Sequence, residues 1–262
     1  METVYNCRRY QYETGEHITF YHHAINAGKE KPEDSLLNKT HDISDRTPEA
    51  EKHAMTVSAS RAKNNVYRIA RSNKWDWFIT LTFDRTKTDA SDYDLVLYRL
   101  KIFLNNLQKR KCPDMKYIIV PELHKDKEHY HFHGLLANVD NLTFKAWKVD
   151  RKKKQIIYNI TDWSYGFTTA TKVLDTGRVS SYITKYITKS VDEHLKEKRR
   201  YYYSRNCHIA EEEHFLLDEE DFRKIYADRI VYVKTVDIPQ ASQQITCLLY
   251  TSDAADDLIG VD

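Results

Sequence analysis

The segment from Trp75 to Asp84 alternates between two kinds of side chain, and this alternation constrains the fold more than any other feature of the sequence. Its odd-numbered positions from Ile79 to Phe83 are all apolar, whereas Thr80 and Thr82 fall on the opposite face of an extended chain. A period of two residues predicts a β-strand that buries one face. The rest of the domain must therefore supply a sheet and a layer that covers it.

Six further segments after this strand alternate between the two periodicities of regular structure. They are a helix over 91–110, strands over 115–123 and 129–139, a short helix over 142–147, a strand over 166–173 and a helix over 178–191. The order is β-α-β-β-α-β plus one further helix, which is the split βαβ order of ferredoxin-like domains. We therefore predict an α+β fold with a ferredoxin-like antiparallel sheet, helices on one face of it, and polar N- and C-terminal extensions.

The sequence outside this domain divides into three more segments. Residues 1–50 form a polar N-terminal extension with a hairpin that turns at Thr14-Gly15, and Asp45 or Thr47 caps a helix that runs to Ser72. The core domain is expected over 51–192 and an accessory C-terminal region over 193–246. Residues 247–262 resemble the in-frame translation of a sequencing-library adapter, so we expect native sequence to end near Thr246; an acidic tail is the alternative.

Charge and composition exclude some classes of protein. The net charge is +2, but it becomes +6 without residues 247–262, which carry four aspartates and no Lys or Arg. The sequence contains no run of about 18 apolar residues and no signal peptide, which argues against a membrane protein. Its four cysteines form no CxxC pair, so a cytoplasmic location is expected.

A metal-ligand candidate lies in the strand over 129–139. His131 and His133 are two residues apart, so a strand places both imidazoles on one face, roughly 6.5–7 Å apart along the backbone. Glu122, late in the preceding strand, joins them if it sits opposite an odd-numbered residue such as His131, whereas a slip of one residue turns it away. His124 and His129 are weaker candidates. A solvated strand face is the alternative interpretation of the pair.

A nucleophile candidate lies in the last predicted helix. Tyr182 and Tyr186 are four residues apart and share a helix face, and Lys185 and Lys189 each follow a tyrosine by three positions. Tyrosine has a pKa of about 10, so an adjacent ammonium and a metal-polarised phosphate must supply the electrostatics for nucleophilic attack. Ordinary packing of a buried helix face is the alternative.

Two basic segments predict contacts to nucleic acid. The first contains Lys152, Lys153 and Lys154. The second contains Arg199, Arg200 and Tyr202 and interleaves cations with aromatic rings that can stack on unpaired bases. Solvated charged loops are the alternative for both.

Together, three motifs resemble the HUH endonuclease superfamily, specifically the rolling-circle replication initiators of small single-stranded DNA phages and plasmids. The motifs are Phe78–Phe83, the pair His131 and His133 with Glu122 upstream, and Tyr182-x-x-x-Tyr186. The resemblance spans roughly residues 75–190. Because a lysine follows each tyrosine, the chain matches neither the one-tyrosine nor the two-tyrosine subtype cleanly.

The resemblance implies an enzyme that nicks and rejoins single-stranded DNA and starts rolling-circle replication. Mg²⁺ or Mn²⁺ would be held by Glu122, His131 and His133, and a tyrosine, with Tyr182 favoured, would form a 5′-phosphotyrosyl link with the lysines assisting. The implied partners are a single-stranded DNA origin and the host replication machinery and helicase, in the bacterial cytoplasm if a phage encodes the chain. The origin sequence, the metal, the host and the oligomeric state stay open.

Three other functions compete with this interpretation. An HUH relaxase or transposase shares the motifs, although the multi-histidine cluster that resembles relaxases is not found in this sequence. A non-catalytic module could bind single-stranded nucleic acid through the aromatic side chains of its sheet. A metal-dependent phosphohydrolase would use the metal ligands without the tyrosines.

Overall fold

The computed structural model describes residues 3–13, 15–27, 47–189, 198–226, 230–238 and 243–250. The chain divides into two compact units, Met1–Asp45 with Ala210–Asp262, and Arg46–Ile209. These ranges differ from the predicted segments, because strands from both ends of the chain pair within the first unit. Among the helices in the described ranges, none is long and apolar enough to cross a bilayer.

The unit formed by the two ends of the chain is a five-stranded antiparallel sheet in the order β10-β1-β2-β12-β11. Its elements are β1 (Thr3–Tyr12), β2 (Gly15–Ala27), β10 (Glu212–Phe215), α5 (Glu219–Tyr226), β11 (Ile230–Ile238) and β12 (Gln243–Tyr250). The predicted hairpin is confirmed, with Tyr12 paired to Gly15. Phe222 of α5 packs on Phe20, and Leu248 is buried in the same core.

Strand β12 crosses the boundary predicted near Thr246. Its residues Cys247 and Leu248 pair with β2 and β11, so four of the residues assigned to the adapter lie in the sheet. Residues 251–262 lie outside the described part of the chain. The origin of residues 247–262 therefore stays a prediction.

The unit from Arg46 to Ile209 contains a seven-stranded antiparallel sheet in the order β6-β7-β8-β3-β5-β4-β9. Its strands are β3 (Trp77–Thr82), β4 (Lys116–Leu123), β5 (Tyr130–Ala137), β6 (Phe144–Asp150), β7 (Gln155–Ile160), β8 (Thr168–Lys172) and β9 (Tyr202–Tyr203), and its helices are α2 (Pro48–Arg71), α3 (Tyr93–Arg110) and α4 (Thr176–Lys189). The α+β class and the antiparallel pairing are confirmed. Strand β5 lies between β3 and β4, so these two strands are not direct neighbours.

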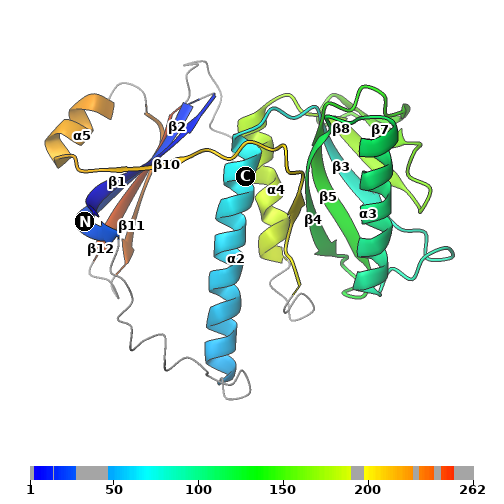
Figure 1. The fold of residues 1–262 in the computed structure, drawn as a ribbon, viewed down its shortest axis with the longest axis horizontal. Coiled ribbons are helices and arrows are strands. Elements are labelled where there is room, and N and C mark those ends of the chain that lie inside the picture. The colour runs from blue at the N-terminus through cyan, green and yellow to red at the C-terminus, as the bar shows by residue number, and fades with distance from the viewer. Residues whose placement is uncertain are drawn as a thin grey trace. The chain divides into compact units, whose positions relative to one another are not determined.

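Helices cover both faces of this sheet, which corrects the prediction of helices on one face (Figure 1). Helix α3 packs on the face that carries Ile79 and Phe132. Helices α2 and α4 pack on the other face, against Ile118 and Leu135. The reason is that β4 and β5 have apolar side chains on both faces, so each face needs a cover.

The predicted short helix over Leu142–Trp147 is wrong, because this segment begins the hairpin of β6 and β7. The basic run between the strands forms the turn. The carboxylate of Asp150 accepts hydrogen bonds from the backbone N–H groups of Lys152 and Lys153, and Lys154 has a φ of 49°. Periodicity alone missed this turn because it depends on an aspartate side chain and a left-handed backbone conformation.

Both predicted helix starts follow local capping chemistry. Thr47 accepts a hydrogen bond from the N–H of Ala50, and Pro48 occupies the first turn of α2, which ends at Ser72 as predicted. Asp92 caps α3 through the N–H groups of Asp94 and Leu95. These caps fix where the two long helices begin on opposite faces of the sheet.

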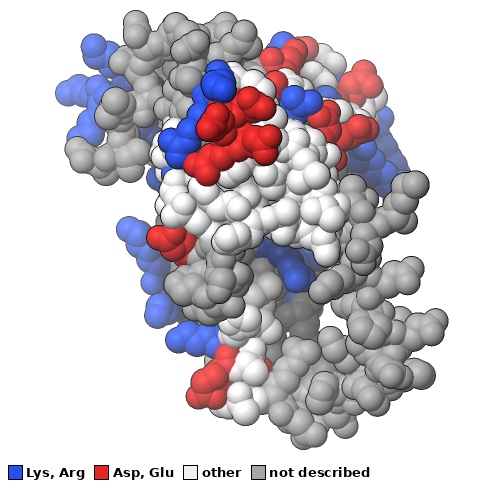
Figure 2. Space-filling view, turned by 90° about the vertical axis from the view of Figure 1, so that its left-hand side faces the viewer, with Lys and Arg blue, Asp and Glu red and all other residues white. Residues whose placement is uncertain are grey.

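Charged side chains are spread unevenly over the surface. On the face drawn in Figure 2, acidic side chains gather in one compact patch and basic side chains form separate groups. Helix α5 has three acidic residues in its first turn, and two of them pair with Arg223 and Lys224 one turn later. The small net charge therefore conceals local surfaces of opposite sign.

We predict that the core beneath β5 dominates the stability of this sheet. Phe132 is fully buried on the α3 face, so Phe132→Ala removes a packed ring and leaves a cavity. We expect the free energy of unfolding to fall by about 3–5 kcal/mol, measured by urea denaturation. Tyr98→Ala, at an exposed site on α3, is the control and should change it by less than about 0.5 kcal/mol. Equal effects of the two variants would contradict this view of the core.

Candidate active site

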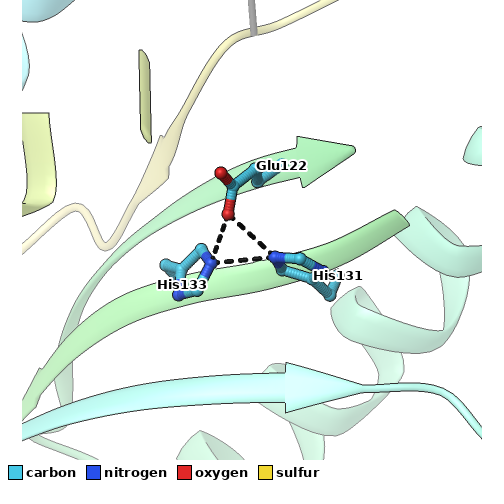
Figure 3. Close-up of side chains that lie close together, drawn as sticks. All are labelled: Glu122, His131 and His133. Atoms are coloured by element: carbon cyan, nitrogen blue, oxygen red, sulfur yellow. Dashed lines mark hydrogen bonds and ion pairs between the residues drawn. The ribbon is translucent and has the colours of Figure 1, made fainter. Parts of the chain in front are cut away.

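Glu122, His131 and His133 bring three ligand atoms together on the α4 face of the sheet (Figure 3). Glu122 on β4 sits directly opposite His131 on β5, as the predicted register requires. The Nε2 atoms of His131 and His133 lie 2.9 Å apart, and they lie 2.9 and 2.7 Å from the same carboxylate oxygen of Glu122. The structure thus brings together the three residues that the sequence predicted as a group.

The spacing of these atoms fits one divalent ion. Nitrogen and oxygen ligands bind such ions at about 2.1 Å, so two ligands at right angles lie about 3 Å apart. The three observed separations are all close to that value. Two imidazoles and one carboxylate suit several ions, so the group can hold a metal but does not identify it.

Burial makes the electrostatics of this group strong. Glu122 and His131 are 9% exposed and His133 is 7% exposed. Burial alone opposes ionisation of Glu122, but the hydrogen bonds and charges of His131 and His133 overcome it and hold the pKa of Glu122 well below its usual value. The carboxylate is therefore ionised and available as a ligand at neutral pH.

Thr80 is a supporting residue that the sequence analysis did not assign to the site. It sits opposite His133 in the β3–β5 ladder, and its Oγ1 lies 3.1 Å from Nδ1 of His133. A ring that binds a metal through Nε2 carries its proton on Nδ1, which would then donate to this hydroxyl. The signal was present in the alternation of β3, which places Thr80 on the face away from Ile79, but the partner strand could not be known.

The two weaker histidine candidates lie outside the ligand group. His129 places Nδ1 2.9 Å from a carboxylate oxygen of Asp126 in the turn between β4 and β5. His124 places its ring edge-on to His131, with 5.6 Å between the ring centroids. Both residues border the site without joining the group of three.

The two tyrosines of α4 lie beside the histidines. The ring of Tyr186 stacks on His133 with 3.6 Å between ring centroids, and its hydroxyl donates a hydrogen bond of 2.9 Å to the hydroxyl of Tyr182. Tyr186 is only 7% exposed, whereas Tyr182 is 40% exposed. Phe78 on β3 contacts both phenol rings. Tyr186 is thus part of the core, and Tyr182 faces outward.

Burial raises the pKa of Tyr186 above its usual value. The hydrogen bond to Tyr182 and the negative charge of Glu122 act in the same direction. The proton therefore stays on Tyr186, and this hydroxyl serves as a donor to Tyr182.

Two lysine side chains approach the outer tyrosine. The Nζ atoms of Lys185 and Lys153 lie 5.6 and 6.0 Å from the centroid of the Tyr182 ring. Lys153 comes from the β6–β7 turn and Lys185 from α4. Lys189 ends α4, and its side chain lies outside the described residues.

A groove of about 730 Å³ opens beside the tyrosines. Its wall includes Tyr182, Tyr186, Phe78 and Thr80, and it continues to the basic turn through Lys153. The side chains that line it also include the cations Lys148, Lys172 and Arg178, the carboxylates Asp150 and Asp175, and the indole of Trp147. The groove joins an aromatic surface, a net excess of positive charge and the candidate nucleophile.

Comparison with protein families identifies the segment that carries this site. Residues 76–191 match the replication-associated protein family of the ORF2 type. This part of the chain belongs to that family. The match runs from the start of β3 past the end of α4, so it includes the metal-ligand group and both tyrosines. Comparison with curated proteins and with solved structures gives no match for this chain.

The second basic segment lies outside the family match and away from the groove at Tyr182. Arg200 is 8% exposed, and burial lowers its pKa. The hydroxyl of Tyr202 lies 3.1 Å from that of Tyr93, which also donates to the backbone oxygen of Arg199. The structure therefore does not bring these residues to the ligand group, and their contact with nucleic acid stays a prediction.

We predict that the ligand group of this replication-associated segment binds Mn²⁺ with an affinity that depends on each ligand. Glu122→Gln and His131→Ala each remove a ligand and should abolish binding that isothermal titration calorimetry detects at neutral pH. Thr80→Val should weaken binding about 10- to 100-fold by removing the partner of His133.

The control is His53→Ala, at an exposed histidine of α2. It should bind Mn²⁺ as the parent protein does. Parent-like binding by both ligand variants would rule out this metal site.

Proposed function

We propose that this protein is a metal-dependent tyrosine nickase and strand transferase that initiates rolling-circle replication of single-stranded DNA. The observation that carries the proposal is the contact of Tyr186 with His133, because it links the tyrosine pair directly to the metal-ligand group. Membership of residues 76–191 in a replication-associated family supports the same conclusion. The chemistry assigned below to each residue is part of the proposal.

The metal-ligand group would face the scissile phosphate. A divalent ion held by Glu122, His131 and His133 would supply positive charge that polarises this phosphate. His133 is held by Thr80 on one side and by the ring of Tyr186 on the other, so its orientation is fixed before DNA binds. Such preorganisation is the main contribution that a protein makes to this kind of transfer.

Tyr182 is the proposed first nucleophile, because it is the exposed member of the pair and lines the groove. Its oxygen forms a bond to phosphorus while the bond from phosphorus to the 3′-oxygen breaks. The proton of Tyr182 leaves to solvent and the 3′-oxygen gains one, which gives a 5′-phosphotyrosyl link and a free 3′-hydroxyl. A later attack by a 3′-hydroxyl reverses these steps and rejoins the strand without ATP.

Tyr186 would assist this step as a hydrogen-bond donor. Its bond to the Tyr182 oxygen strengthens as negative charge develops there, because bonds to charged acceptors are stronger. Lys185 adds positive charge next to the same ring. Lys189 is proposed to act in the same way, and Tyr186 to act as the nucleophile in a second round.

The groove beside Tyr182 suits an unpaired DNA strand. Phe78 and Trp147 offer aromatic surface for bases, and Lys153 with its neighbours Lys152 and Lys154 offers charge for the backbone. The proposed substrate is a single-stranded origin of a phage replicon. The host would supply the polymerase and the helicase in its cytoplasm.

The alternatives predict different chemistry at the same site. A binding module would retain DNA without forming a covalent adduct, and a phosphohydrolase would cut DNA without either tyrosine. A relaxase or transposase would form the same adduct on a different DNA substrate. The packing of Tyr186 on His133 favours the tyrosine-dependent reactions over the first two.

We predict a covalent adduct that depends on the tyrosines. With Mn²⁺ and a pool of random-sequence single-stranded oligonucleotides, the parent protein should form an adduct that survives boiling in detergent. Tyr182→Phe should lower its yield at least tenfold, and the double variant with Tyr186→Phe should abolish it.

The matched control is Tyr98→Phe, at an exposed tyrosine of α3. It should form the adduct at the parent yield. Cleavage by the double tyrosine variant would instead identify a phosphohydrolase, and DNA retention by the parent without any adduct would identify a binding module.

We also predict that Lys153 contributes to DNA affinity through charge. Lys153→Glu should weaken binding of oligo(dT), and the plot of log affinity against log salt should become shallower by about one unit. Fluorescence anisotropy over a salt series measures both. Lys63→Glu, at an exposed lysine of α2, is the control for net charge. An unchanged slope for Lys153→Glu would remove this lysine from the interface.

A further inference from the structure

A second groove lies between α3 and the segment that follows α4. It has a volume of about 710 Å³. Lys101 and Asn105 of α3 form one side, and Arg199, Tyr203 and Arg205 form the other. These residues come from parts of the sequence about 100 positions apart, so the sequence analysis saw only the second of the two walls.

The charge of this groove is of one sign. Lys101, Arg199 and Arg205 line it together with the buried Arg200, and no Asp or Glu is found among the described residues of its wall. A wall with several cations and no carboxylate attracts a polyanion, and arginine in particular binds phosphate through two parallel hydrogen bonds. The groove therefore favours a ligand that carries repeated phosphates.

An exposed aromatic ring stands at the same place. Tyr203 is 40% exposed, and its ring stacks on Tyr201 at 6.0 Å between centroids and 21° between planes. Strand β9 pairs with β4, which fixes the alternation of these residues. Tyr202 therefore takes the opposite orientation and contacts Tyr93. The rigid pair of Tyr201 and Tyr203 leaves an open ring face on which a base can stack.

The second groove is separate from the groove at Tyr182. Helix α3 covers the face of the sheet opposite to the metal-ligand group, and β9 is the edge strand at one end of the sheet order. The Tyr182 groove instead borders β3, β7 and β8, towards the other end of that order. One short stretch of DNA therefore does not explain both grooves.

We propose that the groove between α3 and Arg199–Ile209 is a second binding site for single-stranded DNA. Lys101, Arg199 and Arg205 bind successive phosphates, and Tyr203 stacks on one base. This site needs neither metal nor tyrosine nucleophile, so it goes beyond the nicking function and does not depend on it. It gives the protein a place to hold strand that is remote from the scissile phosphate.

The test is equilibrium binding of fluorescent oligo(dT) in EDTA, where no metal-dependent nicking takes place. The double variant Lys101→Glu with Arg205→Glu should bind at least tenfold more weakly than the parent. The slope of log affinity against log salt should become shallower by about two units, one for each lost phosphate contact. Lys109→Glu with Lys63→Glu changes the net charge equally at exposed lysines outside the groove and should change affinity by less than threefold.

Base stacking is tested by two changes at one position. Tyr203→Ala should weaken oligo(dT) binding about tenfold, and Tyr203→Phe should retain parent affinity because the ring is kept. Photocrosslinking of an oligonucleotide with 4-thiothymidine should label the peptide that contains Tyr203. Circular dichroism melting checks that each variant is folded.

Equal affinity of the groove variant and the lysine control would overturn the proposal. So would parent-like binding by a folded Tyr203→Ala together with labelling confined to the Tyr182 groove. Because the assay contains no active metal, loss of the nicking activity in other experiments leaves this result unaffected, and the two hypotheses fail independently.

Discussion

The register between β4 and β5 is the constraint on which the rest of the site depends. A strand presents alternate residues to opposite faces, so a slip of one residue exchanges every inward side chain for an outward one. Here the pairing of Glu122 with His131 puts all three candidate ligands on the face of α4, while Phe132 enters the core beneath α3. Core packing and the candidate metal chemistry are thus two faces of one strand.

The position of α4 follows from this arrangement. Because β4 and β5 are apolar on both faces, helices are needed on both sides, and α4 fills the side that carries the histidines. Tyr186 belongs to this packing as much as to the site, since it is buried against His133. The two interpretations of the tyrosines, core and chemistry, are therefore not exclusive. The inner ring builds the core, and the outer one meets the groove.

Features that depend on local pattern could be predicted from the sequence, and features that depend on distant pairing could not. Alternation located β3 and β5, and a short polar turn implied the hairpin that brings Glu122 to the histidines. Thr80 escaped notice because its role depends on β3 lying next to β5. The hairpin of β6 and β7 was mistaken for a helix because its turn depends on Asp150. The sheet that joins the two ends of the chain had no local signal at all.

The turn between β4 and β5 gives this hairpin a second anchor. Asp126 accepts hydrogen bonds from the N–H groups of Glu128 and His129, and His124 and His129 close the loop through their backbones. Alignment is thus secured at the tip by polar contacts and along the strand by the burial of Phe132, without help from any ion. Small zinc domains fold only when their metal arrives. In this hairpin the ligands are assembled by the protein itself, so the affinity for an ion would not be diminished by the work of ordering the chain.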